Sequence, residues 1–478
     1  MITIFEKSVP GRGNYQLPKA VDTDSELKPE MVRSKLDLPE VSELDIVRHY
    51  TALSKRSYGV DNGFYPLGSC TMKYNPKINE DMSRLPEFVN FHPLQNEEYS
   101  QGSLELMYNL KEYLKEVTGF FDGTLQPASG AHGELTSIMM MKAYHLKNGD
   151  TKRTKMLIPD SAHGTNPATA NMCGMECVEI PSDSEGGVDV KKLEELISDE
   201  FAGMMLTIPN TLGLFDPNIL KISKILHDHG ALLFMDGANL NAILGIVKPA
   251  EMGVDFMHIN LHKTFSTPHG GGGPGGGFVG CTEKMAPYLP AQKIIKEGDT
   301  YKTIEDKEKS IGRMRAFYGN FGIDVRAYTY ALRLGKEGTR RVGQYSVLNA
   351  NYVKARLAPY LNLPYKRHCM HEVVFNDEKQ AQYHVSTMDM AKRLIDFGYH
   401  PPTVYFPMIV HGALMIEPTE TENKETLDEF IKVMIQITEE AKTSAELLQQ
   451  APTRANVRRV DAVKAARNPV IVCNTCCN

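Results

Sequence analysis

The strongest constraint on the fold is an alternation of short apolar runs with helical segments, which begins near residue 100. Four of these runs are predicted to be strands: residues 156–159, 204–208, 232–235 and 256–259. Segments with helical periodicity separate them, such as residues 219–229, which Gly230 is expected to end. Strands that alternate with helices build a mostly parallel sheet with helices on both faces. The sequence therefore predicts the α/β class.

Polar side chains gather where these predicted strands end. Asp236 ends the third run, and His262 and Lys263 follow the fourth. Residues 160–163 and the pair Asn210-Thr211 follow the first two runs in the same way. Ligands of such sheets bind beyond the carboxyl ends of the strands. We therefore expect a ligand site at this edge.

Lys263 indicates the chemistry of the expected site. It follows an apolar strand, stands next to His262, and precedes a glycine-rich segment, residues 270–277, where backbone can approach a ligand closely. A desolvated lysine loses affinity for its proton and becomes a nucleophile. Asp236, on the neighbouring predicted strand, could pair with the pyridine nitrogen of pyridoxal phosphate while Lys263 binds its aldehyde as a Schiff base. A surface lysine and a turn or cap aspartate are the alternative interpretations.

Further segments supply the other contacts that this cofactor needs. Ser129, Gly130 and Ala131 open a predicted helix, where free N–H groups and the helix dipole would hold the phosphate. An ordinary helix cap is the alternative for this segment. His163 is expected to stack on the pyridine ring, or else to be a structural histidine. Ala238 is small enough to pack beneath the ring.

The glycine tract also has a second interpretation. Residues 271–276 satisfy the G-x-G-x-x-G pattern of dinucleotide-binding loops. However, the tract follows no Rossmann first strand, opens no helix, leads into the apolar pair Phe278-Val279, and lacks the ending of a Walker loop. We interpret it as an active-site loop.

The composition excludes several kinds of partner. A net charge of −6 gives no electrostatic reason to expect nucleic acid or an anionic membrane surface. No stretch approaches the ~20 apolar residues of a membrane helix. The N-terminus turns polar too early for a secretory signal, so we expect a cytoplasmic protein whose eight cysteines are free thiols. Cys473, Cys476 and Cys477 lack a nearby fourth ligand, so no metal site is predicted and this tail is interpreted as frayed.

Three regions are expected along the chain. Residues 1–99 form an arm and an active-site segment, residues 100–325 a large cofactor-binding domain, and residues 326–478 a linking helix with a small α+β domain. In the arm, Ser42 to Asp45 resembles a capping box, and the apolar helix face that follows is Leu44, Val47, Tyr50 and Leu53. In the small domain the expected elements are strands at 372–375 and 414–416 and helices at 388–397 and 424–448.

Five segments together resemble the glycine decarboxylase P-protein family of the glycine cleavage system. They are residues 67–75 (LGSCTMKYN), 129–134, 161–166, 260–265 with 268–275, and 315–322. The chain looks like subunit 2 of the two-subunit form, and the resemblance extends from about residue 4 to residue 469. It implies a pyridoxal-phosphate enzyme of the aspartate-aminotransferase fold (fold type I), with Lys263 as the cofactor lysine.

The resemblance also implies a reaction and its partners. Glycine would be decarboxylated, and the remaining aminomethyl group would pass to the oxidised lipoyl arm of the H-protein, an oxidoreductase activity of the glycine dehydrogenase type. Subunit 1 would join the chain in an α2β2 heterotetramer. Cys70, Thr71, Asn210 and His269 are expected to contact the substrate, and His262 or His269 could move protons. A different pyridoxal-phosphate enzyme, such as an amino-acid decarboxylase or a desulfurase, and a cofactor-free scaffold subunit remain as alternatives.

Overall fold

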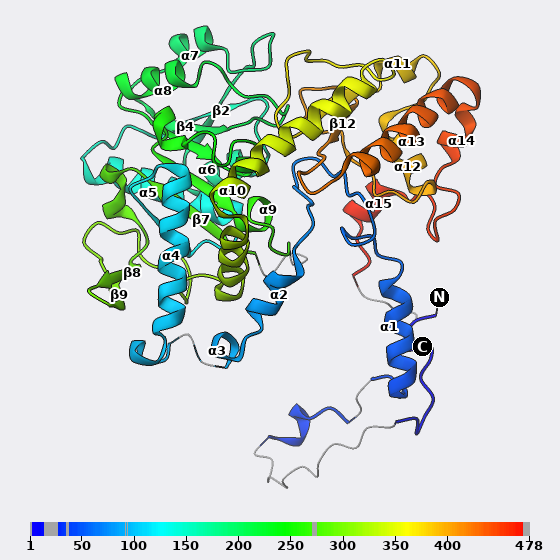
Figure 1. The fold of residues 1–478 in the computed structure, drawn as a ribbon, viewed down its shortest axis with the longest axis horizontal. Helices are drawn as coiled ribbons and strands as arrows, with labels where there is room; N and C mark the ends of the chain where they lie inside the picture. Colours follow the sequence, from blue (N-terminus) through cyan, green and yellow to red (C-terminus); the bar gives the residue numbers. More distant parts are fainter. Residues whose placement is uncertain are drawn as a thin grey trace. The chain divides into compact units, whose positions relative to one another are not determined.

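The computed structural model describes residues 2–13, 27–34, 38–90, 92, 94–269 and 275–471 (Figure 1). The chain divides into two compact units, one of which is Gly63–Ala455, while the other joins Met1–Asn62 with Asn456–Asn478. The larger unit, Gly63–Ala455, contains the sheets and all the residues that are expected to contact the cofactor or the substrate. None of the described helices is long and apolar enough to cross a membrane.

A seven-stranded sheet forms the centre of the larger unit (Figure 1). Its spatial order is β1-β7-β6-β5-β4-β2-β3. The strands are β1 (Asp122–Thr124), β2 (Lys155–Pro159), β3 (Glu176–Ile180), β4 (Phe201–Thr207), β5 (Leu232–Asp236), β6 (Phe256–Asn260) and β7 (Gly277–Cys281). Strands β2 to β6 pair in parallel, and β7 runs antiparallel to both β6 and β1. The predicted α/β fold and its mostly parallel sheet are confirmed.

Alternate residues of the central strands pack into separate hydrophobic cores. In β5, Leu233 and Met235 join the core that contains α4 and α8, whereas Leu232 and Phe234 join the core that contains α5 and α6. Because both faces are buried, the strand is apolar throughout instead of alternating with polar residues. The helices concerned are α4 (Gln101–Thr118), α5 (Gly130–Lys147), α6 (Thr165–Met172) and α8 (Ile219–Asp228).

A smaller sheet and its helices form what we call the small domain. Strands β10 (Val373–Asn376), β12 (Ala413–Ile416) and β11 (Thr403–Val404) pair antiparallel in that order. Phe375, Leu414 and Phe430 are fully buried in its core. The helix α10 (Phe321–Leu357) runs from the large sheet to this domain (Figure 1) and is interrupted at Gly335, where φ is 59°.

Local side-chain signals explain two helix starts, and one helical segment differs from expectation. The Ser42 capping box starts α1 (Glu43–Ser54), and a second box at Ser386 starts α12 (Thr387–Asp396). The helix expected at residues 424–448 is two helices, α13 (Lys424–Thr443) and α14 (Ala445–Gln450). Ser444 adopts a non-helical conformation between them, and α14 turns so that Leu448 is buried in the small-domain core. Tertiary packing therefore overrides a continuous helical pattern.

The remaining elements are short. The other α-helices are α2 (Lys77–Ser83), α3 (Pro86–Val89), α7 (Val190–Leu196), α9 (Leu261–Thr264), α11 (Glu378–Ala381) and α15 (Ala462–Arg467). Strands β8 (Gln292–Glu297) and β9 (Thr300–Glu305) form a separate antiparallel pair.

Residues 67–74, which we call the bridging segment, connect the small domain with the large sheet. At one end, Leu67 forms an antiparallel bridge with Ile416, and Thr403 Oγ1 donates to the Gly68 carbonyl at 2.7 Å. At the other end, the buried Lys73 ammonium donates at 2.7 Å to the carbonyl of Thr264, which directly follows Lys263. The segment is therefore hydrogen-bonded to both the small domain and the turn after β6.

The small-domain core supplies a stability test. Leu414→Ala is expected to cost about 2–5 kcal/mol, because Leu414 is fully buried and the truncation leaves a cavity. Leu220→Ala is the control, since Leu220 is 64% exposed on α8 and its truncation should change stability by less than about 0.5 kcal/mol. Thermal unfolding of both variants measures the difference. Equal shifts in the two variants would contradict the assigned core.

Candidate active site

A cavity of about 220 Å³ opens at the carboxyl edge of the parallel strands. The structure brings all eight predicted cofactor residues to its wall: Ser129, Gly130, Ala131, His163, Asp236, Ala238, His262 and Lys263. These residues come from four separate stretches of the chain, and the shared sheet edge is what gathers them. Their contacts with a cofactor stay a prediction.

Lys263 lies in the single helical turn α9, immediately after β6. Its side chain is half-buried, and its Nζ donates to the Ser69 carbonyl of the bridging segment at 2.8 Å. Lys263 is the one lysine among the described residues that line the cavity. The bridging segment, which the resemblance marked, therefore meets the predicted cofactor lysine directly.

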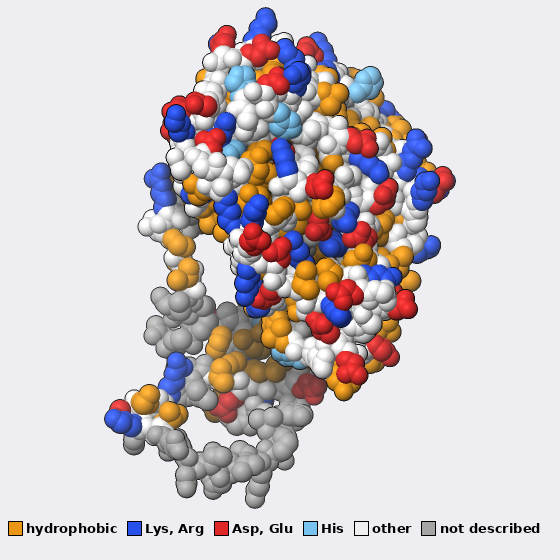
Figure 2. All heavy atoms as spheres, turned by 90° about the vertical axis from the view of Figure 1, so that its left-hand side faces the viewer, with side chains coloured by type: hydrophobic (Ala, Val, Ile, Leu, Met, Phe, Trp, Pro, Cys, Tyr) orange, Lys and Arg blue, Asp and Glu red, His pale blue; other side chains and the backbone are white. Residues whose placement is uncertain are grey.

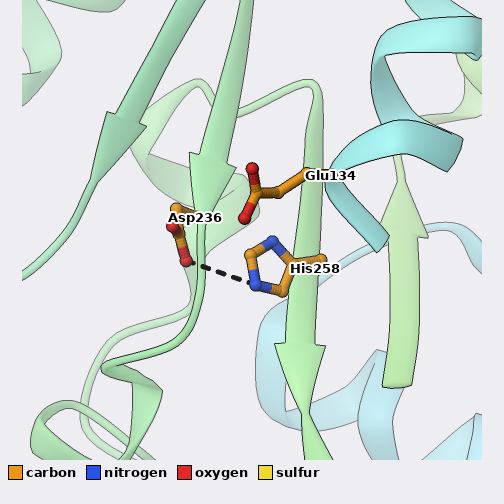
Figure 3. Close-up of side chains that lie close together, drawn as sticks. All are labelled: Glu134, Asp236 and His258. Carbon is orange, nitrogen blue, oxygen red and sulfur yellow. Dashed lines mark ion pairs between the residues drawn. The ribbon is translucent and has the colours of Figure 1, made fainter. Parts of the chain in front are cut away.

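Asp236 ends β5 with its carboxylate at the cavity wall (Figure 3). Its Oδ1 accepts from the Ala238 amide at 2.9 Å and lies 3.2 Å from His258 Nε2, and its Oδ2 accepts from Asn166 Nδ2 at 3.2 Å. Burial alone would raise the pKa of this carboxyl, but His258, the Ala238 hydrogen bond and the Lys263 charge lower it below its usual value. Asp236 is therefore ionised.

His258 and Glu134 are site residues that the sequence reasoning missed. His258 lies on β6 in register with Asp236, and Glu134 comes from the first turns of α5 (Figure 3). Glu134 accepts from Thr165 Oγ1 at 2.8 Å and from Thr169 Oγ1 at 3.2 Å. The available signal for His258 was a lone polar residue inside an apolar run, two positions before Asn260 and so on the same face of the strand.

The start of α5 forms one wall of the cavity. Ser129 is the N-cap residue of this 18-residue helix, and its side chain makes no capping hydrogen bond. A Cβ atom on Gly130 would lie 2.3 Å from Asn260 Oδ1, and one on Gly133 would lie 2.7 Å from His258 Cβ. The absence of side chains at both glycines lets the helix terminus, with its free N–H groups, approach β6 closely.

Two neighbouring histidines stand beside Lys263 and are both neutral. The rings of His262 and His269 are 4.9 Å apart in an edge-to-face arrangement. Burial, the adjacent His269 ring and the Lys263 charge lower the pKa of His262 to about 3. Burial and the Lys263 charge lower the pKa of His269 to about 4. Neither ring therefore adds positive charge next to the lysine amine near neutral pH.

The four expected substrate residues are not among the described residues that line the cavity: Cys70, Thr71, Asn210 and His269. Burial raises the pKa of the Cys70 thiol to about 11, which keeps it neutral. Asn210 donates to the Gly186 carbonyl at 2.7 Å and accepts from the Leu212 amide, as a residue that stabilises a turn does. Their substrate contacts stay a prediction. Residues 270–274 of the glycine tract and the three terminal cysteines lie outside the described residues.

The wall of the cavity fits pyridoxal phosphate. Thr207 Oγ1, His258 Nδ1, Asn260 Oδ1 and His262 Nδ1 are buried and have no hydrogen-bond partner among the described residues. A polar ligand would satisfy them, because buried polar groups are rarely left unpaired. The ionised Asp236, the α5 terminus and Lys263 match the ring nitrogen, phosphate and aldehyde of this cofactor.

Comparisons with known proteins agree with this geometry. The family Aminotransferase class-V matches residues 129–290, and the family Glycine dehydrogenase, C-terminal domain, matches residues 342–459. The crystal structure of an inhibitor-bound glycine decarboxylase (P-protein) superposes with a TM-score of 0.73 at 18% identity, over 86% of this chain and 93% of that one. A cysteine desulfurase from Thermococcus onnurineus superposes with a TM-score of 0.60 at 17% identity, over 79% and 95%. The chain is thus a pyridoxal-phosphate enzyme of fold type I.

Sequence relatives narrow the class to one family. The chain is 55% identical to the probable glycine dehydrogenase (decarboxylating) subunit 2 of Halalkalibacterium halodurans, over 98% of this chain and 97% of the relative. It is 53% identical to the protein of the same name from Staphylococcus aureus, over 98% and 96%. The chain belongs to the family of glycine dehydrogenase (decarboxylating) subunit 2 proteins.

The close approach of α5 to β6 can be tested. Gly130→Ala is expected to weaken binding of pyridoxal phosphate about tenfold or more, because the new methyl group would displace Asn260 and the helix terminus. Gly164→Ala is the matched control, since a Cβ at Gly164 meets nothing within 4 Å. Cofactor titration of both variants measures the affinities. Unchanged affinity in Gly130→Ala would contradict the assigned phosphate wall.

Proposed function

We propose that the chain decarboxylates glycine and transfers the remaining aminomethyl group to the oxidised lipoyl arm of an H-protein. The observation that carries this proposal is the arrangement of Lys263 and ionised Asp236 in one cavity, in a chain that shares 55% of its residues with a glycine dehydrogenase (decarboxylating) subunit 2. The low-identity structural neighbours support the fold alone. The family supports the choice of glycine among the substrates of this fold.

Different residues of the cavity would hold different parts of the cofactor. When bound, pyridoxal phosphate supplies a ring that accepts electrons from the α-carbon of an amino acid. Lys263 would hold its aldehyde end, Ser129 to Ala131 its phosphate, and Asp236 its ring nitrogen. Ionised Asp236 favours a proton on that nitrogen, since a carboxylate stabilises the charged form of a neighbouring base. Asn166 and His258 orient the carboxylate from both sides.

Charge balance around Lys263 also favours the proposed chemistry. The bridging segment presents the Ser69 carbonyl to the amine, and the two nearby histidines are neutral. Neutral His262 and His269 each have a ring nitrogen that can accept a hydrogen bond, but pKa values of about 3 and about 4 make both rings weak bases near neutral pH. His262 is the one of the two that lines the cavity, so we assign it the role of a hydrogen-bonding group at the site.

The partners proposed are subunit 1, in an α2β2 heterotetramer, and a lipoylated H-protein. The name subunit 2 carried by the relatives supports a second kind of chain. The expected apolar face of α1 is exposed, with Leu44, Val47 and Tyr50 each more than half exposed and Leu53 38% exposed, so this face is available for another chain. Over the face seen in Figure 2, basic and acidic side chains are interspersed.

The described cysteines are free, which suits the cytoplasmic location that we propose.

Substitution of the cofactor lysine tests the core of the proposal. Lys263→Ala is expected to abolish covalent attachment of pyridoxal phosphate and with it glycine decarboxylation, because no other described residue of the wall carries an amine. The visible absorbance of the bound cofactor and the mass of the borohydride-reduced chain measure attachment. Lys336→Ala, at an exposed position, is the control. A Lys263→Ala chain that keeps both the absorbance and the activity would overturn the assignment.

The requirement for partners is tested by reconstitution. The purified chain alone is expected to show little glycine–bicarbonate exchange, and addition of subunit 1 with lipoylated H-protein should restore it. H-protein without its lipoyl group is the control, because only the lipoyl arm can accept the aminomethyl group. Full exchange by the single chain would contradict the heterotetramer.

A further inference from the structure

A second cluster of buried ionisable groups lies beside the bridging segment, outside the wall of the cofactor cavity. Its members are His371, Glu372 and Glu417, and none is more than 1% exposed. One ligand-type atom of each lies within 4.8 Å of those of the other two. The cluster therefore places two carboxyl groups and an imidazole together in the interior.

The two carboxyl groups hold the backbone of the bridging segment. Glu417 accepts at both oxygens, from the Thr71 amide at 2.8 Å and from Thr71 Oγ1 at 2.6 Å. Glu372 accepts at Oε2 from the Ser69 amide at 2.8 Å. Its other oxygen, Oε1, has no hydrogen-bond partner among the described residues and lies 3.6 Å from His371 Nε2, which also has none.

The backbone that these groups hold is strained. Ser69 and Thr71 have φ values of 65° and 49°, in the left-handed region that costs free energy for residues other than glycine. Such a conformation persists when surrounding contacts determine it, and here the contacts are the carboxyl groups of Glu372 and Glu417. Ser69 in turn accepts the hydrogen bond of Lys263 Nζ. The cluster therefore acts on the lysine through one residue.

The two carboxyl groups cannot both be ionised at low cost. Burial and the neighbouring carboxylate raise the pKa of Glu372 well above its usual value, and burial also raises the pKa of Glu417. The hydrogen bonds from Thr71 and the charge of Lys263 partly offset the rise at Glu417. Burial and the Lys263 charge lower the pKa of His371 to about 3, so its ring is neutral and one nitrogen can accept.

We propose that Glu372 is protonated and Glu417 is ionised, and that together they are positioning residues that place the Ser69 carbonyl against the Lys263 amine. Glu372 carries the proton because its Oε1 is the oxygen without a donor and faces the free Nε2 of His371. Glu417 stays ionised because both of its oxygens accept hydrogen bonds. The inference rests on the proposed role of Lys263 as the cofactor lysine.

The other ionisable groups that face this pair leave the assignment unchanged. Burial raises the pKa of the Cys70 thiol to about 11 and that of the Cys369 thiol to about 12, so both are neutral. Glu420, which follows Glu417 along the chain, is paired with the buried Lys73 ammonium at 2.6 Å. Lys263 supplies the remaining positive charge.

The assignment has a consequence for pH dependence. Because the pKa of Glu372 is raised on folding, the folded chain binds more protons than the unfolded chain above the ordinary glutamate pKa. The stabilisation from this group is therefore present at low pH and lost as pH rises through the folded-state pKa. Loss of the Glu372 proton would leave two buried carboxylates side by side and loosen the hold on Ser69.

Two isosteric variants of the full chain separate the two carboxyl groups. Glu372→Gln keeps an acceptor for the Ser69 amide and an N–H toward His371, but it cannot ionise. It should keep cofactor affinity within about threefold. It should also lose the fall in stability that the parent chain shows as the pH rises, which we call the alkaline decline. Glu417→Gln can keep both hydrogen bonds to Thr71, since the Thr71 hydroxyl can accept from the new N–H group, but it replaces two charge-assisted hydrogen bonds by neutral ones. It should therefore weaken cofactor binding about tenfold at every pH. Glu425→Gln, an exposed carboxylate shortly after Glu417, is the control and should match the parent chain.

Two measurements decide the result. Titration with pyridoxal phosphate gives the affinity, and thermal unfolding of the cofactor-free chain between about pH 7 and about pH 9 gives the proton linkage. Equal loss of affinity in both variants, or an unchanged alkaline decline in Glu372→Gln, would overturn the inference. So would a stoichiometric metal ion found by elemental analysis and lost in His371→Asn. The unfolding measurement decides the protonation of Glu372 even if Lys263 does not bind the cofactor. It also decides it if Glu417→Gln fails to fold, because it compares only the parent chain with Glu372→Gln.

Discussion

The site depends on a buried, ionised carboxylate at the end of a central strand. Asp236 keeps its charge because an amide, an asparagine, a histidine and the nearby Lys263 charge outweigh the cost of burial. Those groups come from the turn after the strand, from α6, from β6 and from α9. The buried carboxylate therefore stays ionised only when the parallel sheet has brought these groups together. The chemistry of the site depends on the fold for this reason.

The bridging segment extends this dependence to the small domain. Lys73 donates to the Thr264 carbonyl in the turn that carries Lys263, and the Ser69 carbonyl accepts from the Lys263 amine. The Thr71 amide donates to Glu417, which directly follows β12. A change in the packing of the small domain would therefore reach Lys263 through hydrogen bonds between side chains and the backbone of the bridging segment. One of the segments that carry the family resemblance therefore also couples the two domains.

Much of the architecture could be predicted, since periodicity and end signals are local. The four apolar runs became β2, β4, β5 and β6, and the Ser42 capping box and Gly230 stood where helices begin and end. The antiparallel strand β7 was not predicted, because a glycine-rich run has a weak strand pattern and its direction is decided by its neighbours. The break at Ser444 was missed because burial of Leu448 requires the rest of the core.

The sequence by itself determined the residue types of the site and the edge at which they would meet, because a strand end is a local property and parallel strands end together. It did not determine which residues face one another. His258 and Glu134 entered the site, and Cys70, Thr71, Asn210 and His269 are not among the described residues that line the cavity. Only the tertiary structure decided these contacts, because the order of the strands in space sets them. It also decided the left-handed conformation of Ser69, because the Glu372 carboxyl that accepts from the Ser69 amide lies 303 residues further along the chain.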